Sequence, residues 1–293
     1  MKTARGVVFG WIVVVAMFVA ACSTVPVTGR KQVLLVSGQE EMQLGLTSFN
    51  QMKQEVPVSK DPRLNAMVQE VGKRIAAVAS KDLPNAQWEF VVFDSPEANA
   101  FCLPGGKVGV YTGILPITKD EAGLATVIGH EVAHAAAHHG AERMSEQMVM
   151  QTGGQVVSGL SSDPKMQALF GTLYGAGATL GRTLPHSRKQ ESEADHIGLI
   201  YMAQAGYNPQ EAVNFWQRFS AYNKQNGGGG TPWFLSTHPV DTKRIAALKA
   251  EMPNALKYYK GPGVVAPTAV TPSAPANPSA TPPPSNIIGR PPR

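Results

Sequence analysis

The stretch GHEVAHAAAHHG, residues 129–140, places four histidines and one glutamate within twelve positions. His130 and His134 are four residues apart, so on a helix their imidazoles project from one face, a turn apart. Two neutral imidazoles in this arrangement can bind a single zinc ion. Glu131 is too close in sequence to His130 to join the ligands, yet it is well placed to contact a metal-bound water. The stretch therefore predicts a metal site on a helix; two histidines packed on an alanine-rich helix are the alternative.

A zinc site of this kind needs a third protein ligand. A downstream glycine and histidine, as in HExxHxxGxxH, are excluded because Ala137 and Gly140 occupy those positions. The other common source is a glutamate on a second helix, and residues 185–199, PHSRKQESEADHIGL, supply Glu191 with Asp195 one turn later. Taken alone, this is a common surface-helix pattern. Combined with the histidine pair, it predicts Glu191 as the third ligand and Asp195 as the group that orients a ligand histidine.

Three helix starts frame these motifs. Thr118–Glu121, TKDE, and Ser187–Gln190, SRKQ, both match the capping box, so each predicts the start of a helix that carries half of the site. Asn208 followed by Pro209 predicts the start of a third helix.

Strand signals are confined to one part of the chain. Residues 88–94, 98–103 and 107–112 are predicted strands, with the Pro-Gly-Gly of residues 104–106 as the turn between the last two. The rest of residues 38–260 has helical spacing. The sequence therefore predicts an α+β fold that is mainly helical and contains a small sheet.

Three motifs, HEVAH, ESEADHIGL and the later STHPVDTKRI of residues 236–245, resemble the HtpX/BepA-type zinc metallopeptidases. These are gluzincins related to the CAAX prenyl proteases, and the similarity is greatest to their periplasmic lipoprotein branch. The resemblance covers about residues 25–255 and implies a zincin-like domain whose edge strand lies by the active site. It also implies one Zn²⁺ per chain on His130, His134 and Glu191, with Glu131 as the general base and Asp195 behind His130.

Four further histidines are not ligands in the family pattern. His138 and His139 are predicted to be packing or surface residues, and His186 and His196 receive no role. Glu193 is predicted to be structural, because it points elsewhere on its helix than Glu191.

The third motif carries another candidate. Pro239 suits the first turn of a helix and so places His238 at that helix's N-terminus, just after the four glycines 227–230. There His238 can donate a hydrogen bond to an oxyanion or bind the metal, and an equivalent histidine in similar relatives occupies the open zinc position. We expect His238 to gate the site. Arg244 is predicted either to fix this loop or to contact substrate.

Asn99 and Ala100 begin an edge-like strand. Thermolysin-like enzymes bind an extended substrate backbone against such a strand, so these residues are candidate substrate contacts. An ordinary buried strand is the alternative.

The N-terminus has the pattern of a secretory signal. Lys2 and Arg5 precede an apolar run of 15 residues, shorter than the ~18–20 that a spanning helix needs. Val19-Ala20-Ala21-Cys22 resembles a bacterial lipobox and predicts lipidation of Cys22. An uncleaved signal anchor and an ordinary signal peptide are the alternatives. With Cys22 lipidated, Cys102 has no disulfide partner and is predicted to be a buried, inert thiol.

These signals divide the chain into a signal peptide at residues 1–21, a tether at 22–37, the metallopeptidase domain at 38–260 and a tail at 261–293. The tail has ten prolines in 33 residues and is predicted to be disordered, as a spacer or as a ligand for a partner domain.

The charge balance excludes one class of partner. Four of the 26 basic residues lie in the signal and the tail, which leaves 22 basic against 21 acidic residues. A nearly neutral body gives no case for nucleic-acid binding.

The resemblance to the periplasmic lipoprotein branch, whose members act in outer-membrane protein quality control, implies a zinc endopeptidase that hydrolyses misfolded or misassembled envelope proteins. We expect it to be lipid-anchored to a membrane of the bacterial envelope, most simply the outer one, and to face the periplasm. Its predicted partners are these substrates, the membrane and outer-membrane assembly machinery. The alternative is a lipid-anchored chaperone or assembly factor with a gated, mostly inactive zinc site. A helical scaffold without metal would require all three motifs to be coincidental.

Overall fold

Helix α5 (Glu121–Ala136) runs through the middle of the molecule and carries the HEVAH motif. The computed structural model describes residues 22–152, 187–226, 234, 237–239 and 242–262. Every residue of α5 from Gly123 to Ala136 is buried. Its glycines and alanines let neighbouring elements approach closely, so α5 is the axis around which the core forms.

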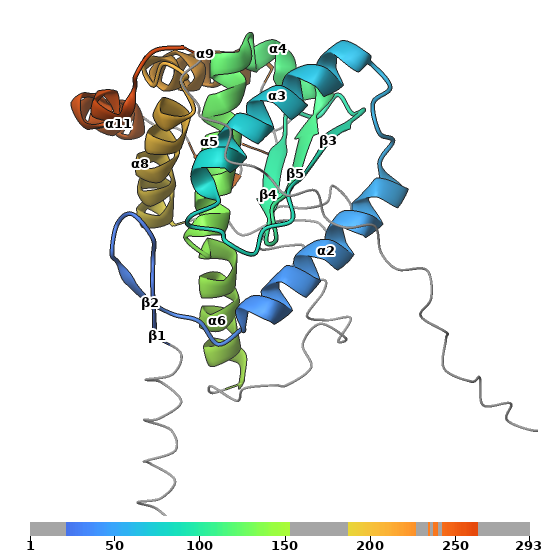
Figure 1. The fold of residues 1–293 in the computed structure, drawn as a ribbon, viewed down its shortest axis with the longest axis vertical. Coiled ribbons are helices and arrows are strands. Elements are labelled where there is room, and N and C mark those ends of the chain that lie inside the picture. Colours follow the sequence, from blue (N-terminus) through green and yellow to red (C-terminus); the bar gives the residue numbers. More distant parts are fainter. Residues whose placement is uncertain (1–21, 153–186, 227–233, 235–236, 240–241, 263–293) are drawn as a thin grey trace, which may run out of the picture.

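Helices cover α5 on several sides. α3 (Pro62–Ala79), α4 (Leu115–Thr118), α8 (Arg188–Gln204) and α9 (Gln210–Asn226) all contact α5, and α11 (Thr242–Ala255) packs on α8 and α9. Figure 1 shows α8 on one side of α5 and a small sheet on the other. The short 3-10 turns Thr112–Ile114 and Leu256–Tyr258 connect or extend these helices.

The sheet contains β3 (Glu89–Phe93), β4 (Ala100–Leu103) and β5 (Lys107–Tyr111) in the order β3-β5-β4. β3 runs parallel to β5, and β4 runs antiparallel to it. β4 is thus an edge strand, and it lies against α5. The predicted α+β fold, including the three strands and the edge strand beside the site, is confirmed.

Successive side chains alternate between the two faces of the sheet, and both faces are covered by packed side chains. One face joins the main core under α3 and α5. The other carries Phe93, Phe101 and Tyr111, on which α2 (Gly38–Glu55) packs Phe49 with ring centroids 6.2 Å from both Phe93 and Phe101.

Two of the three predicted helix starts are confirmed. Ser187 and Gln190 form the reciprocal capping box of α8, and Asn208 Oδ1 accepts a hydrogen bond from the Gln210 amide at the start of α9. The predicted capping box at Thr118 is wrong: Thr118 ends α4, and Asp120 caps α5 by accepting from the Gly123 amide at 2.9 Å. Lys119, with φ 73°, provides the turn between the two helices.

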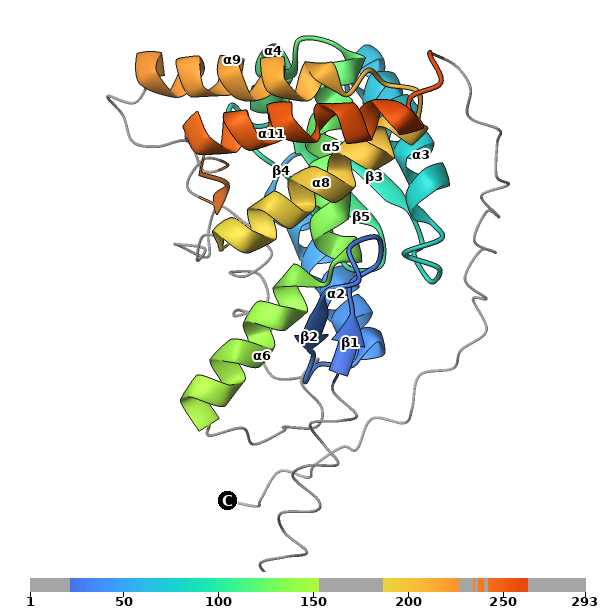
Figure 2. The ribbon, with the colours of Figure 1, turned by 90° about the vertical axis from the view of Figure 1, so that its left-hand side faces the viewer.

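Residues 22–37, which were predicted to be a tether, contain a β-hairpin. β1 (Cys22–Thr24) and β2 (Lys31–Val33) form an antiparallel hairpin beside α6 (His139–Thr152), as Figures 1 and 2 show. Val25 between the strands is buried. Arg30 of the same hairpin binds carboxylates on α6 and α8, so this segment is part of the folded body.

The predicted signal peptide, residues 1–21, and nearly all of the tail, residues 263–293, lie outside the described residues, as does His186. Among the helices that the structure does describe, none combines the length and the apolar character needed to cross a bilayer.

Candidate metal centre

The site forms where α5 crosses α8, and two glycines allow the crossing. A Cβ added to Gly129 would lie 3.1 Å from the Gly198 carbonyl oxygen, and one added to Gly198 would lie 3.0 Å from the His130 amide nitrogen. The two backbones are therefore nearly in contact. This places Glu191 of α8 over the histidine face of α5.

The three predicted ligands converge. His130 Nε2 lies 3.1 Å from His134 Nε2, and Glu191 Oε1 lies 3.3 Å from His134 Nε2. All three side chains are buried. Two segments about sixty residues apart in the sequence thus direct two imidazole nitrogens and one carboxylate oxygen at a common point.

His238 joins this group from a third segment. Its Nδ1 lies 3.2 Å from His130 Nε2 and 2.9 Å from Glu191 Oε1, and one ligand atom from each of the four residues lies within 4.8 Å of the others. The predicted position at a helix N-terminus is wrong. The His238 amide donates to the Phe234 carbonyl at 2.8 Å, so His238 ends a helical turn, and α11 begins only at Thr242.

The donor set fits zinc. Imidazole nitrogen and carboxylate oxygen are typical zinc ligands, and tetrahedral bonds of ~2.0–2.1 Å separate neighbouring ligand atoms by about 3.3 Å. The observed separations of 2.9 to 3.3 Å between consecutive ligand atoms are close to that value. Four buried nitrogen and oxygen atoms that converge in this way fit the ligand set of a single cation.

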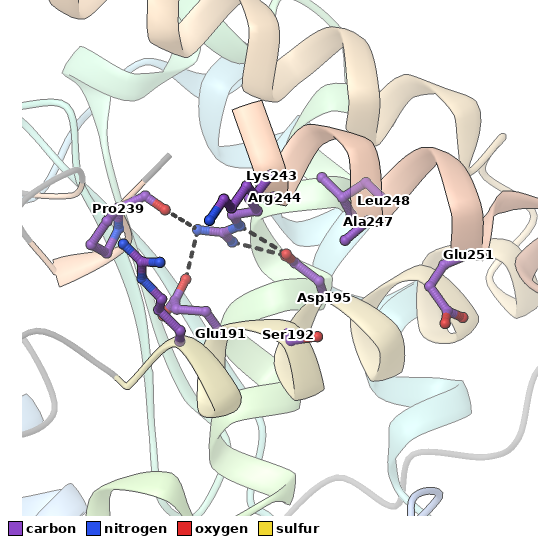
Figure 3. A pocket seen from close by; sticks show the side chains of 10 residues that line it. Glu191, Ser192, Asp195, Pro239, Lys243, Arg244, Ala247, Leu248 and Glu251 are labelled. Carbon is purple, nitrogen blue, oxygen red and sulfur yellow. Dashed lines mark hydrogen bonds and ion pairs between the residues drawn. The ribbon is translucent and has the colours of Figure 1, made fainter. Parts of the chain in front are cut away.

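Asp195 and Arg244 hold the ligands from behind. Asp195 Oδ1 lies 3.0 Å from His130 Nδ1, the nitrogen that faces away from the ligand group. Arg244 binds both Asp195 oxygens at 2.8 Å, Glu191 Oε2 at 2.6 Å and the Pro239 carbonyl at 3.2 Å (Figure 3). Its guanidinium also stacks 3.8 Å from the Trp216 ring centroid.

The prediction for Asp195 therefore agrees with this geometry. Of the two roles predicted for Arg244, these contacts match the fixing of the loop. The contacts in the structure do not add support for direct contact with substrate.

Comparison with known proteins gives the site its context. Residues 62–252 match Peptidase family M48. The chain belongs to this family. It is 34% identical over 259 residues to the Mitochondrial metalloendopeptidase OMA1 of Saccharomyces cerevisiae, covering 80% of this chain and 70% of that protein. The chain is therefore a zinc metalloendopeptidase with one metal ion.

Other M48 relatives are more distant or much longer. The human Metalloendopeptidase OMA1, mitochondrial, is 30% identical over 85% of this chain, which spans 49% of that protein. The Beta-barrel assembly-enhancing protease of Escherichia coli is 27% identical over 78% of this chain and 47% of that protein. The relatives with higher identity carry the mitochondrial name, so the comparisons confirm the family and leave the periplasmic branch a prediction.

The charges of the M48 site suit metal binding. Burial holds the pKa of His134 well below its ordinary value, which keeps its nitrogens available as ligands. Against the opposing effect of burial, His238 and Arg244 hold the pKa of the Glu191 carboxyl well below its usual range. Against the opposing effect of burial, Asp195 and Glu191 raise the pKa of His130 to about 9. A proton and a metal ion therefore compete for this ring.

Glu131 has a different environment from that of Glu191. It is buried, and its Oε1 makes no hydrogen bond within the part of the chain that the structure describes; the His238 Nε2 is 3.4 Å away. Burial raises the pKa of this carboxyl. A desolvated carboxyl with a raised pKa beside the ligands can take up and release a proton, as a general base requires.

Asn99 and Ala100 lie at the start of the edge strand, as predicted, but both are buried. The Asn99 carbonyl accepts from the Tyr111 amide at 3.0 Å, which extends the pairing with β5. Their contact with substrate stays a prediction. Cys102 on the same strand is buried, and burial raises the pKa of its thiol, so the structure agrees with an inert side chain.

Two residues next to the ligands were predicted to be structural only. His139 Nδ1 lies 2.8 Å from His134 Nδ1, and His139 Nε2 lies 3.0 Å from Glu193 Oε2. The only signal in the sequence is the position of each one, His139 five residues after His134 and Glu193 two residues after Glu191. Such spacing reveals no contact until the turn between α5 and α6 is known.

Proposed function

We propose that this M48 metalloendopeptidase is lipid-anchored through Cys22 and hydrolyses peptide bonds of misfolded or misassembled envelope proteins. The observation that carries the catalytic part is Glu131. Its buried Oε1 makes no hydrogen bond to the described residues although it lies beside four converging ligand atoms, an arrangement that costs stability. Such a group is typical of a general base.

In the proposed reaction, His130, His134 and Glu191 would hold a zinc ion, which would supply an activated water and polarise the scissile carbonyl. Glu131 accepts the proton from the attacking water and delivers it to the leaving nitrogen. Asp195 accepts from His130 Nδ1 and so fixes the tautomer that leaves Nε2 free. Arg244 holds Asp195 and Glu191 in place through its two ion pairs.

His238 supports a gated form of this site. Four protein ligands are typical of closed zinc sites, whereas a catalytic site keeps one position open for water or substrate. His238 lies 2.9 Å from Glu191 and 3.4 Å from Glu131, in the space that these reactants would need. We propose that His238 must leave for catalysis. A role as oxyanion donor is the alternative for this residue.

The proposed substrates and location have separate support. An unfolded polypeptide is extended and can lie along the edge strand that begins with Asn99 and Ala100. The exposed Cys22 opens a hairpin on the surface of the folded body. The name of the E. coli relative suggests outer-membrane assembly machinery as a partner, and the signal-like N-terminus suggests the bacterial envelope.

The second candidate function is a lipid-anchored chaperone or assembly factor whose zinc site stays shut. The observation that favours it is the gathering of four protein ligands. A zinc site that stays shut does not need Glu131 as a general base. Replacing Glu131 by glutamine therefore separates the two proposals.

The decisive experiment compares the full chain with Glu131→Gln, using casein and a misfolded porin, with and without a zinc chelator. We expect the wild-type protein to cleave both in a chelator-sensitive manner. Glu131→Gln should retain zinc but lose about 10²–10⁴-fold in kcat, because the amide cannot accept the proton. Glu121→Gln, an exposed change on the same helix, is the matched control. Equal cleavage by both variants would overturn the assignment of Glu131.

A further inference from the structure

The ring of His134 is engaged on both sides. Its Nε2 faces the other ligands, 3.1 Å from His130 Nε2. Its Nδ1 lies 2.8 Å from the Nδ1 of His139, a side chain with no solvent exposure. His139 Nε2 then lies 3.0 Å from Glu193 Oε2. The proposed function uses neither His139 nor Glu193.

The chemistry of zinc binding sets the direction of these hydrogen bonds. A histidine that binds metal through Nε2 carries its proton on Nδ1, so His134 donates from Nδ1 to the lone pair of His139 Nδ1. His139 then carries its own proton on Nε2 and donates it to Glu193. A carboxylate can only accept, so Glu193 fixes the tautomers of both rings.

The N-terminal hairpin holds Glu193. The Thr28 hydroxyl donates to Glu193 Oε1 at 2.5 Å, and Arg30 Nε donates to Oε2 at 2.7 Å. Arg30 is fixed in turn by Glu142 of α6, which it contacts at 2.5 and 3.0 Å. A connected series of hydrogen bonds thus runs from the hairpin that Cys22 opens to a zinc ligand.

We propose that His139 and Glu193 are positioning residues for the zinc ligand His134, and that Thr28 and Arg30 of the hairpin complete this relay. The proposal rests on the metal assignment of the proposed function. Each ligand histidine then has its own carboxylate on α8: Asp195 contacts His130 directly, and Glu193 acts on His134 through His139.

These hydrogen bonds couple the docking of the hairpin on α8 to the metal centre. If the hairpin leaves α8, Glu193 loses two donors and is free to turn away from His139. The His134 ring then loses the acceptor for its Nδ1 proton, which orients the ring and increases the basicity of Nε2. Zinc binding and hairpin docking should therefore stabilise each other.

The test measures zinc dissociation constants of the full chain by chelator competition and records Co²⁺ absorption spectra as a readout that does not depend on activity. His139→Phe fills the ring's volume but offers no acceptor. We expect it to weaken zinc binding by about 10–100-fold and to alter the Co²⁺ spectrum. His139→Asn keeps an acceptor near the Nδ1 position and should recover part of the affinity. His138→Asn is the matched control, because His138 binds Glu41 and has φ 54°, which asparagine tolerates.

A second pair of variants tests the hairpin. Arg30→Gln should weaken zinc binding in the same direction but less, because Thr28 still donates to Glu193. Lys31→Gln, an exposed neighbour that contacts Thr24, should leave it unchanged. If His139→Phe fails to fold, as judged by circular dichroism, Glu193→Gln takes its place, because a neutral amide holds the His139 proton less firmly.

The outcomes separate the relay from the metal centre. Wild-type zinc affinity and spectrum in folded His139→Phe or Glu193→Gln, together with loss of zinc in His134→Ala, would overturn the relay and keep the metal centre. A wild-type protein that binds no zinc would overturn both. Equal affinities of Arg30→Gln and the wild type would remove the hairpin from the relay.

Discussion

At the scale of single residues, His238 is the proposed gate of the site. Its Nδ1 is 2.9 Å from Glu191 Oε1 and 3.2 Å from His130 Nε2, so it completes a four-ligand set. It is buried and ends a helical turn that includes Phe234, whose ring lies 4.5 Å from the imidazole, centroid to centroid. We expect opening of the site to displace this turn as well as the side chain.

His238→Ala should raise casein cleavage several-fold and weaken zinc binding, because it removes a ligand and opens the position beside Glu131. The measurements are kcat and the zinc dissociation constant. His196→Ala is the control, since His196 binds Glu251 away from the ligands. A loss of about 10²–10³-fold in kcat at unchanged zinc affinity would identify an oxyanion donor and contradict the gate. No change in either quantity would exclude both roles.

At the scale of elements, the site depends on how closely α5 and α8 approach. Gly129 and Gly198 meet at the crossing, where a Cβ on Gly198 would lie 3.0 Å from the His130 amide nitrogen and 3.1 Å from the Gly129 carbonyl oxygen. Both neighbours are helix backbone and cannot rotate away. Any side chain here must move one helix relative to the other.

Gly198→Val should separate α5 from α8, destabilise the fold by about 1–3 kcal/mol through overpacking and weaken zinc binding by moving Glu191 away from the histidines. Urea unfolding and chelator competition measure the two effects. Gly38→Ala is the control, because a Cβ at Gly38, also in a helix, meets nothing within 4 Å. Unchanged zinc affinity in Gly198→Val would show that the crossing distance does not position Glu191.

At the scale of the whole molecule, the N-terminal hairpin joins α6 to α8. Arg30 binds Glu142 of α6 and Glu193 of α8, and its side chain is only 15% exposed. Gln190 also donates to Glu142 at 2.8 Å. The hairpin, α6 and α8 are therefore held together by hydrogen bonds and ion pairs rather than by apolar contact alone.

This arrangement predicts a loss of stability in acid. Although burial raises it, the hydrogen bonds from Arg30 and Gln190 lower the pKa of Glu142 below its ordinary 4.5. A carboxyl with a lowered native pKa contributes stability that is complete above the ordinary value and is lost as the pH falls below it. The free energy of unfolding of the wild type should therefore exceed that of Glu142→Gln at pH 7, and the difference should shrink as the pH is lowered past 4.5. Urea titrations across this range measure it, and a difference independent of pH would contradict the assignment.

The amino-acid sequence by itself determined those features that are local. The spacing of His130 and His134 places both on one face of α5. Glu191 and Asp195 have the same spacing and share one face of α8. The three strands and the capping of α8 and α9 also follow from residues a few positions apart. The capping box at Thr118 failed because Asp120, two residues later, is an equally good cap and leaves room for α4 to end first.

Only the tertiary structure decided which distant groups meet. His238 reaches the ligands from the end of a helical turn, and β3 pairs in parallel with β5 although β4 lies between them in the sequence. The contact of His139 with His134 depends on the reversal at His138, whose φ is 54°. Local propensity fixes a residue's position along its own helix or strand, whereas these contacts depend on how separate elements pack. That packing depends on which side chains become buried together across the whole chain, and no single stretch of sequence predicts it.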